Sequence, residues 1–379
     1  MKIAFVVHDY RRREGHSRYV VELASRFAEE HEVHVFANEI EAGEGSKIHF
    51  HHVPAWRGSA LGSILSFAVG ATLAVRGRFD IIHNQGLCGF RGNVFTAHIC
   101  NRAWHIALRK TSGNLTFREW VSGTTLGALE HLFYRTARNC QIIAVSNRIA
   151  RDLKRCYHCR APITVIHHGV DARVFAPDGE VRRNIRAQLD IKPDEMAFLF
   201  VGDMRKGGRQ SIRALAQVPA AKLVFVSRSP DAPYRALADE LGVGYRVLFP
   251  GVTNEIQKYY WAADALVLPS HYDSFGMVVT EGMAAGLPVI VSREAGASEL
   301  IEPGQNGLLL DDYNDFGELA AKMRLLTGDR DFARRIGAAG RKTVETYSWD
   351  RIASETMSVY QRLSSEKTST QLERQVRAL

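Results

Sequence analysis

The sequence predicts an α/β protein with two Rossmann-like domains, each built on a parallel, doubly wound sheet. Three observations predict this class. A chain of 379 residues is too long for one ordinary core and suits two domains of somewhat under about 200 residues each. Its composition, 46% apolar and 24% charged, is typical of a folded protein. Short β-branched runs alternate with helical patterns from the first residue onward, which is the order of βαβ units.

Several runs in the first half are predicted as strands, because they are short, rich in β-branched residues and bounded by polar residues. They are residues 2–7, 32–37, 80–83, 93–98 and 141–146. Between the first two runs, Val20, Leu23, Ala24 and Phe27 fall on one helical face. The apolar segment 59–75 could just span a bilayer, but it contains glycine, and a buried helix of an α/β domain is the preferred interpretation.

Proline, glycine and charged residues cluster in residues 162–195 and indicate a domain boundary near 170–195. Strand-like runs then resume at 197–202, 222–227, 245–251, 265–270 and 287–292. We therefore expect a first domain at 1–175 and a second at 176–345, facing each other across a cleft walled by the C-terminal strand ends. A helix at 346–363 is expected to pack back on the first domain, and 364–379 to form a frayed polar tail.

The net charge of +8 favours an anionic partner such as nucleotide phosphates, nucleic acid or a membrane surface. Nucleic acid is set aside because no recognised binding module accompanies the charge. Five cysteines and an opening MKIAFVV without a basic leader indicate the reducing cytoplasm. Cys156 and Cys159 form one C-x-x-C without a second pair, and we expect no metal or redox site there. Fourteen of the fifteen histidines precede residue 170, and we expect most of them to be exposed.

The segment FVGDMRKGGRQSIRAL, residues 200–215, has the pattern of a strand, a tight turn at Gly202 and a helix. Such a turn offers free backbone N–H groups and the positive helix end to an anion, and Arg205 and Lys206 add two cations. The pattern favours a pyrophosphate. Its spacing matches neither G-x-G-x-x-G nor a Walker loop, and ordinary basic residues on a surface loop are the plain alternative.

The segment HYDSFGMVVTEGMAAG holds two carboxylates, Asp273 on a loop and Glu281 inside the helix that follows. One hypothesis is that they grip two sets of hydroxyls, such as those of a ribose and a hexose. A second is a paired general acid and base for glycoside hydrolysis, which spacing alone does not exclude. A third is an acidic residue that complements the helix dipole, which explains only one of them.

Two residues of the first half lie where a ligand could approach. Gly15 stands where the chain enters a helix, and the missing side chain would let a ligand come close to the backbone. His98 follows a predicted strand at the mouth of the cleft. The alternatives are an ordinary helix lead-in and a structural histidine.

Seven segments, in order, resemble glycosyltransferase family 4, the retaining GT-B enzymes, over residues 1–363. They are EGHSRYVVELA, VFTAH, AVSNRIARDL, HHGVDARVF, FVGDMRKG, LFPGVTNEIQKYYWAADALVLPS and DSFGMVVTEGMAAGLPVI. Within the family, the FVGDMRKG and DSFG segments are most similar to bacterial lipopolysaccharide core glucosyltransferases.

The resemblance implies a role for each matching residue. Arg205 and Lys206 would bind the donor diphosphate, Glu281 the ribose, and Asp273 would lie near the transferred sugar, where the family usually has Glu. Further residues are implied in donor binding: Gly15, Gly202, Val252 beside the base, and the stretch Phe275, Gly276, Met277 and Val278; His98 would lie near the donor sugar. A second departure is Glu14-Gly15, where the family usually has two glycines.

The implied reaction moves a sugar, glucose or a related hexose, from a UDP-sugar to a hydroxyl, with retention and without a metal or other cofactor. The acceptor would be a cell-surface glycan or a lipid-linked acceptor such as lipopolysaccharide core. A UDP-sugar epimerase or hydrolase of the same fold and a non-catalytic nucleotide-sugar sensor are the alternatives.

Residues 100–138 combine basic and aromatic side chains. The basic ones are Arg102, Arg109, Lys110, Arg118, Arg135 and Arg138, and the aromatic ones are Trp104, Phe117, Trp120, Phe133 and Tyr134. This composition suits peripheral docking on the anionic inner face of the cytoplasmic membrane. An amphipathic helix pair with its aromatic residues in the core explains it equally well.

Overall fold

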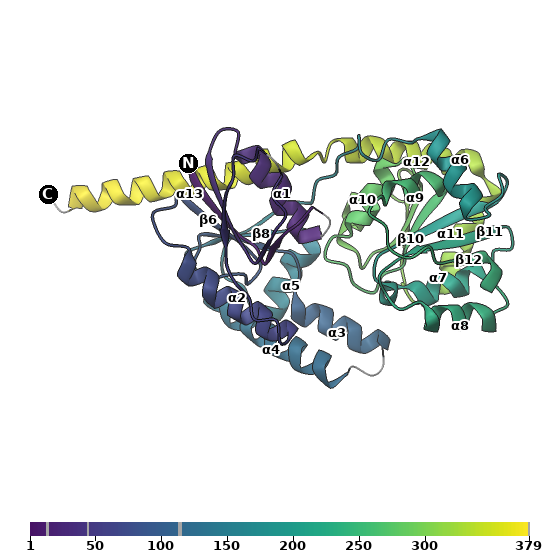
Figure 1. Ribbon diagram of the computed structural model, residues 1–379, viewed down its shortest axis with the longest axis horizontal. Helices are drawn as coiled ribbons and strands as arrows, with labels where there is room; N and C mark the ends of the chain where they lie inside the picture. The colour runs from purple at the N-terminus through teal and green to yellow at the C-terminus, as the bar shows by residue number, and fades with distance from the viewer. Residues whose placement is uncertain (13–14, 44, 113–115, 378–379) are drawn as a thin grey trace. The chain divides into compact units, whose positions relative to one another are not determined.

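The structure is a computed structural model that describes residues 1–12, 15–43, 45–112 and 116–377, with the backbone alone at 111, 112 and 366–377 (Figure 1). The chain forms two compact units. The N-terminal unit comprises Met1–His105, Thr116–Gly169 and Trp349–Leu379, and the C-terminal unit comprises Ile106–Leu115 and Val170–Ser348. Each unit contains one parallel sheet with flanking helices, so the predicted α/β class with two Rossmann-like domains is confirmed.

The N-terminal unit holds a seven-stranded sheet in which every neighbouring pair is parallel. Its order is β5 (His49–His52), β3 (Glu32–Ala37), β1 (Lys2–Val6), β6 (Ile81–Gln85), β7 (Val94–Ala97), β8 (Gln141–Ala144) and β9 (Ile163–Val165). A separate pair joins β2 (Asp9–Tyr10) to β4 (Glu39–Ile40). The sequence did not predict β5, whose HFHH lacks the usual β-branched residues, nor β9, which lies in the stretch interpreted as a boundary.

The helices of this part of the chain are α1 (Gly15–Phe27), α2 (Ala60–Ala74), α3 (Asn101–Ser112), α4 (Phe117–Thr136), α5 (Asn147–Tyr157) and α13 (Trp349–Arg377). The expectation that α2 is a buried helix was wrong in part. Phe67, Ala68 and Ala71 are buried, but Val69 and Leu73 are exposed, because only one face of α2 reaches the core of the unit. Among the described residues, no helix is long and apolar enough to span a membrane.

Helix α13 packs against α1. Trp349 and Tyr360 are buried, and the Tyr360 hydroxyl lies 2.6 Å from His83 Nδ1 of β6. Burial lowers the pKa of His83 to about 3, so the ring is neutral at physiological pH. Beyond residue 363 the helix continues to Arg377, where a frayed tail was expected.

The C-terminal unit holds a six-stranded parallel sheet. Its order is β12 (Val247–Leu248), β11 (Ala221–Val226), β10 (Met196–Val201), β13 (Ala265–Leu268), β14 (Val289–Ser292) and β15 (Leu308–Leu310). The helices are α6 (Gly179–Gln188), α7 (Gly208–Leu215), α8 (Ala232–Glu240), α9 (Gln257–Ala262), α10 (Met277–Ala284), α11 (Phe316–Gly328) and α12 (Arg330–Glu345), with 3-10 turns η1 (Met204–Lys206), η2 (Gly244–Arg246) and η3 (Gly296–Leu300).

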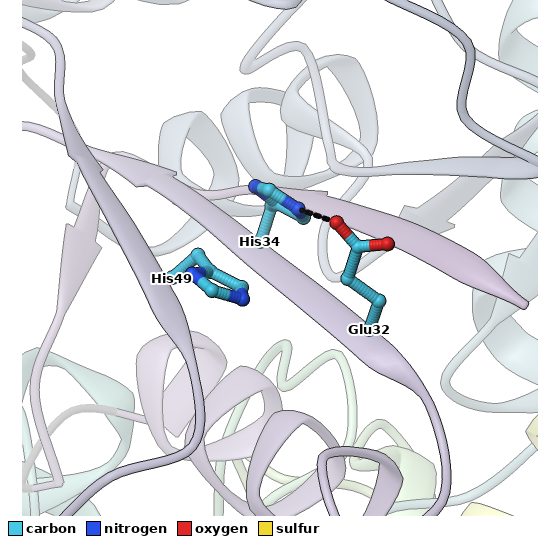
Figure 2. Close-up of side chains that lie close together, drawn as sticks. All are labelled: Glu32, His34 and His49. Atoms are coloured by element: carbon cyan, nitrogen blue, oxygen red, sulfur yellow. Dashed lines mark hydrogen bonds and ion pairs between the residues drawn. The ribbon is translucent and has the colours of Figure 1, made fainter.

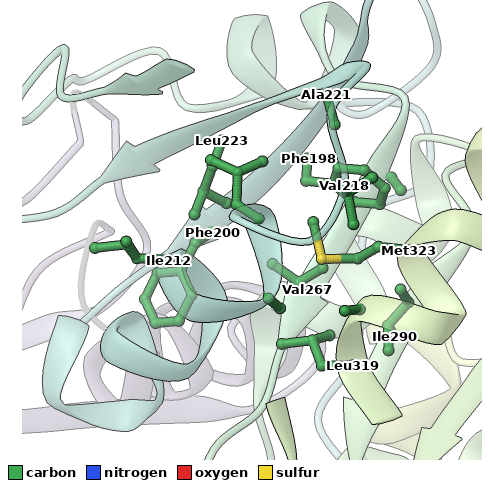
Figure 3. Close-up of a cluster of buried hydrophobic side chains, with 14 of the residues drawn as sticks. Phe198, Phe200, Ile212, Val218, Ala221, Leu223, Val267, Ile290, Leu319 and Met323 are labelled. Atoms are coloured by element: carbon green, nitrogen blue, oxygen red, sulfur yellow. The ribbon is translucent and has the colours of Figure 1, made fainter. Parts of the chain in front are cut away.

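The core of this unit is apolar (Figure 3). Alternate residues of β10, Phe198 and Phe200, enter one cluster with Ile212 of α7 and with Leu319 and Met323 of α11. All five are fully buried, and each such side chain contributes about 1.5–3 kcal/mol. This packing holds β10 rigidly, so the loop that leaves its C-terminal end starts from a fixed position.

The N-terminal unit buries a carboxylate. Glu130 of α4 accepts hydrogen bonds from the backbone N–H (2.9 Å) and the side-chain amide (2.8 Å) of Asn101, and from the Tyr157 hydroxyl of α5. These hydrogen bonds link the start of α3 and the end of α5 to α4. Burial nevertheless raises the pKa of Glu130 from 4.5 to about 7.

The raised pKa predicts a pH dependence of stability. The folded protein holds a proton on Glu130 that the unfolded chain releases above its pKa of 4.5. The stabilisation is therefore complete below pH 4.5 and is lost as the pH rises through about 7. The difference is on the order of 3 kcal/mol.

Urea unfolding of wild type and Glu130→Gln across this pH range measures the effect, because subtracting the two profiles removes the other titrating groups. The exposed Glu29→Gln serves as the control and should keep the wild-type profile. Parallel profiles for wild type and Glu130→Gln would contradict the assignment.

Candidate functional site

Residues 200–215 form the predicted strand, turn and helix: the end of β10, the turn η1 and the helix α7. Gly202 has a φ of 114°, which turns the chain away from the sheet. The turn η1 carries Arg205 and Lys206, and α7 begins at Gly208. The two cations are therefore fixed at the C-terminal edge of the sheet, between the end of a strand and the start of a helix.

Gly207 is the tightest point of this loop. Its φ of 115° is left-handed, and an added Cβ would lie 2.3 Å from the carbonyl oxygen of Pro269. Pro269 directly follows β13, the neighbour of β10 in the sheet. Only glycine permits this approach, so the loops after β10 and β13 lie against each other.

The loop after β13 carries Asp273 and is anchored on its far side. The Asp273 backbone N–H donates to Glu294 O (3.0 Å), and the Gly296 N–H donates to Asp273 O (3.0 Å). Gly276, with a φ of 89°, then caps α10. Met277 and Val278 follow as the first two residues of that helix, where backbone N–H groups lack partners within the helix.

An ion pair joins the two loops. Lys206 Nζ lies 2.8 Å from Asp273 Oδ2, and both side chains are largely buried. The sequence predicted both residues as site residues but gave no sign that they pair, since they are 67 positions apart. The pair fixes the position of both charges at the edge of the sheet.

Arg205 is held in a similar way by a residue that the sequence analysis missed. Its guanidinium lies 2.8 Å from Asp203 Oδ2, and the Ser229 hydroxyl lies 3.2 Å from Asp203 Oδ1. Burial raises the pKa of Asp203, but the hydrogen bonds from Arg205 outweigh it and hold this pKa below its ordinary value. Asp203 directly follows Gly202 in the anion-binding turn, and this is the only signal that could have identified it.

Glu281 is buried in α10. The hydroxyl of Tyr260, itself fully buried in α9, donates to Glu281 Oε2 at 2.8 Å. Sequence reasoning missed Tyr260, because an apolar helical pattern gives it no distinguishing feature. Neither carboxylate lies in the first turn of α10, so the helix-dipole explanation fits neither Asp273 nor Glu281.

The remaining residues of this unit that the sequence predicts in donor binding follow strands at the same sheet edge. Phe275 is buried, and Val252, in the loop after β12, is 63% exposed. His271 lies two residues before Asp273 and is buried. Burial, followed by the Lys206 charge, lowers the pKa of His271 to about 4. The ring is therefore neutral beside the cations at physiological pH.

In the N-terminal unit, His98 follows β7. Its Nε2 lies 2.8 Å from Gln85 Oε1, and the rings of Tyr19, His168 and His16 surround it at centroid distances of 5.2, 5.4 and 6.0 Å. Burial, with the charges of His168 and His16, lowers the pKa of His98 well below its ordinary value. His98 is therefore a neutral donor or acceptor, not a cation.

Gly15 is the first residue of α1, while Glu14 lies outside the described residues. The structure thus brings Gly202, Arg205, Lys206, Asp273, Phe275–Val278 and Glu281 together in the C-terminal unit. Gly15 and His98 belong to the other unit. Such an edge, with two cations, two carboxylates and helix N–H groups, can bind a phosphorylated and hydroxylated ligand.

Two family models match the chain. Residues 13–174 match Glycosyltransferase Family 4, and residues 181–343 match Glycosyl transferases group 1. The uncharacterized glycosyltransferase MJ1607 of Methanocaldococcus jannaschii is 31% identical over 296 residues, which cover 75% of this chain and 75% of that protein.

Solved structures share the fold. WaaG, a glycosyltransferase involved in lipopolysaccharide biosynthesis, matches with a TM-score of 0.78 at 20% identity, covering 94% of this chain and 99% of WaaG. Anabaena Alr3699/HepE, solved in complex with UDP and glucose, matches with a TM-score of 0.72 at 19% identity, covering 95% of this chain and 99% of that one. At these identities the likeness shows the fold alone.

The contact between Gly207 and Pro269 predicts that Gly207→Ala destabilises the protein by at least about 2 kcal/mol, through left-handed strain and a steric clash. Gly304→Ala is the matched control. Gly304 also has a positive φ, 79°, but nothing lies within 4 Å of its added Cβ, so strain alone costs about 1 kcal/mol. Urea unfolding measures both. Equal losses in the two variants would mean that the close approach is absent.

Proposed function

Because this chain belongs to the GT-B glycosyltransferases, we propose that it transfers glucose or a related hexose from a UDP-sugar to an acceptor hydroxyl with retention. The observation that carries the proposal is the Lys206–Asp273 ion pair, which joins the loops after β10 and β13 beside Arg205 and the start of α10. It sets cations, a carboxylate and helix N–H groups along one sheet edge.

In the proposed donor complex, Arg205 and Lys206 neutralise the diphosphate as it departs. Charge develops on this leaving group in the transition state, so fixed cations and N–H dipoles lower the barrier directly. Metal independence is part of the proposal, since these groups take the role of a divalent ion. The UDP and glucose bound by the structurally similar Alr3699/HepE support a UDP-sugar as donor.

The two carboxylates, Glu281 and Asp273, have different roles in the proposed complex. Tyr260 fixes one oxygen of Glu281, which orients that carboxylate for the ribose hydroxyls. Asp273 holds Lys206 and faces the transferred sugar. A carboxylate paired with a cation at 2.8 Å is a poor nucleophile, which favours a same-face displacement over a covalent intermediate. The bond from the anomeric carbon to the phosphate oxygen breaks, the bond to the acceptor oxygen forms, and the acceptor proton passes to the leaving phosphate.

For the acceptor, we favour a lipid-linked or cell-surface glycan such as lipopolysaccharide core, reached by peripheral contact with the inner face of the cytoplasmic membrane. Helix α4 supports this contact at its first turn. Phe117 is 77% exposed and Trp120 48% exposed, and their rings stack at 6.1 Å. The similarity in fold to WaaG agrees with such an acceptor.

The other end of α4 is different. Phe133 packs on Phe95 at 4.7 Å, and Tyr134 stacks on Tyr157 at 5.7 Å. The core explanation of the basic and aromatic segment therefore holds for these two residues, and the membrane explanation is confined to Phe117 and Trp120. Near the C-terminal end of α4, Arg135, Arg138 and Arg160 line a surface pocket, which provides positive charge for an anionic headgroup.

The test of the donor proposal is a UDP-release assay on purified protein with UDP-glucose, UDP-galactose, UDP-N-acetylglucosamine and GDP-mannose, each with and without core-truncated lipopolysaccharide. Release that requires the acceptor supports transfer. A changed sugar that is still attached to UDP would indicate an epimerase. Release of UDP without an acceptor would indicate a hydrolase, and binding of UDP without turnover would indicate a sensor.

In this assay Lys206→Ala and Arg205→Ala should each lower kcat by about 10²–10³-fold, because a group that stabilises transition-state charge is lost. Arg235→Ala is the control. Arg235 is an exposed arginine of the same unit that pairs with Asp231 at 2.8 Å, and its loss should leave kcat unchanged. Full turnover in both site variants would show that the diphosphate binds elsewhere.

The membrane contact is tested by co-sedimentation with anionic phosphatidylglycerol vesicles and neutral phosphatidylcholine vesicles. Replacing Phe117 and Trp120 together with Ser should weaken binding to the anionic vesicles by roughly tenfold or more, since each ring loses a favourable burial. Tyr245→Ser removes an equally exposed aromatic residue of the C-terminal unit and should have no effect. If the double variant binds the anionic vesicles as tightly as wild type, α4 does not make the membrane contact.

A further inference from the structure

The histidines of the N-terminal unit are not distributed as the sequence suggested. Only His16, His49, His52 and His158 of the fifteen are exposed, so the expectation that most would be exposed was wrong. Four histidines gather at the edge of the sheet, His34 on β3 and His49, His51 and His52 on the edge strand β5 (Figure 2). The donor-site analysis uses none of these residues.

The pairing of the two strands creates the cluster. Glu32 and His34 are two positions apart on β3, so both side chains project from the same face. His49 of β5 is the register partner of His34, and Figure 2 shows all three side chains on one side of the strands. His51 follows two positions later on that face, while His52 projects from the opposite one.

The geometry suits a metal ion. One ligand atom from each of Glu32, His34 and His49 lies within 4.8 Å of the others, and His34 Nε2 is 3.0 Å from Glu32 Oε1. A zinc ion about 2.0–2.2 Å from each ligand requires ligand atoms about 3.4 Å apart. Glu32 and His49 are exposed and have room to turn by the remaining distance. Two imidazoles and one carboxylate, completed by water, are a ligand set for zinc and similar divalent ions.

The orientation of His34 is already fixed by its neighbours. His34 Nδ1 lies 2.8 Å from His51 Nε2, and the ring of Phe79 meets His34 edge-on at 5.2 Å. Metal-binding histidines usually hold their second nitrogen in a hydrogen bond of this kind, which aims the first at the ion. A metal ion at His34 Nε2 would take the place of the present contact between this nitrogen and Glu32 Oε1.

We propose that Glu32, His34 and His49 bind a zinc-class divalent ion that links the edge strand β5 to β3. The ion has a structural role. Edge strands are the weakly held part of a sheet, and β5 has only four residues, so a bond across the pair secures it. The three residues lie at the start of β3 and on β5, and the strands β1 and β6 separate them in the sheet from β7, which His98 follows.

Lys2 opposes the ion. Its Nζ lies 2.8 Å from Glu32 Oε1, and with His34 it lowers the pKa of Glu32 to about 2. A metal ion that binds this carboxylate would displace Lys2. Removal of the Lys2 charge should tighten metal binding at these three residues.

The experiment is a titration of purified, tag-free, chelator-treated full-length protein with Co²⁺, followed by its visible absorption, and with Zn²⁺, followed by calorimetry and by Tm. One equivalent should bind and raise Tm. His34→Gln and His49→Gln should each weaken binding by at least about tenfold, while Lys2→Met should tighten it by several-fold. His52→Gln removes a histidine of the same strand from the opposite face and should bind as wild type does.

His49 is exposed, so His49→Gln keeps the test valid if His34→Gln fails to fold. Three outcomes would overturn the proposal. They are no binding at one equivalent, retention of binding in both ligand variants, and a thiolate-to-cobalt absorption band, which would assign the ion to the cysteines. Metal content, absorption and Tm are independent of transferase activity, so failure here leaves the donor proposal standing and the reverse also holds.

Discussion

The site in the C-terminal unit depends on the parallel pairing of β10 with β13. Parallel neighbours end at the same edge of a sheet, so two loops that are far apart in the sequence leave side by side. Gly207 then lets the first loop touch the backbone of the second at Pro269, and the Lys206–Asp273 pair closes the contact. The apolar core around Phe198 and Phe200 keeps the strands from shifting beneath this edge.

The carboxylates at this edge outnumber its two cations before any proposed donor binds. Arg205 pairs with Asp203 and Lys206 with Asp273, and Glu281 adds a further carboxylate. A diphosphate that joins these groups brings still more negative charge, so the two cations alone leave an excess of anions. The proposed diphosphate site therefore also relies on the positive end of α10 and its first N–H groups, with each cation shared between its carboxylate and the phosphate.

The sequence predicted the structural features that depend on residues close together in the chain. It missed those that depend on contacts between distant segments. The anion-binding turn, the strands of both sheets with clear β-branched runs and the glycine-capped α10 all have short-range signatures. The Lys206–Asp273 ion pair, the Tyr260–Glu281 hydrogen bond and the partial or full burial of most histidines depend on register between distant strands and helices. Strand β5 was missed for a related reason, since four residues with three histidines resemble a loop until β3 pairs with them.

The two units use polar groups in different ways. In the C-terminal unit the core is apolar and the polar groups of the site gather along one sheet edge, which suits a scaffold that presents a fixed charged surface. The N-terminal unit attaches helices through buried hydrogen-bonded pairs, His83 with Tyr360 and Glu130 with Tyr157, and the C-terminal unit buries one such pair as well, Tyr260 with Glu281. A buried polar group that loses its hydrogen bond destabilises the fold. These bonds therefore fix α13 and α4 in one arrangement more strictly than apolar contacts would. Since α4 also presents Phe117 and Trp120 to solvent, its internal anchor determines where that exposed aromatic pair stands on the unit.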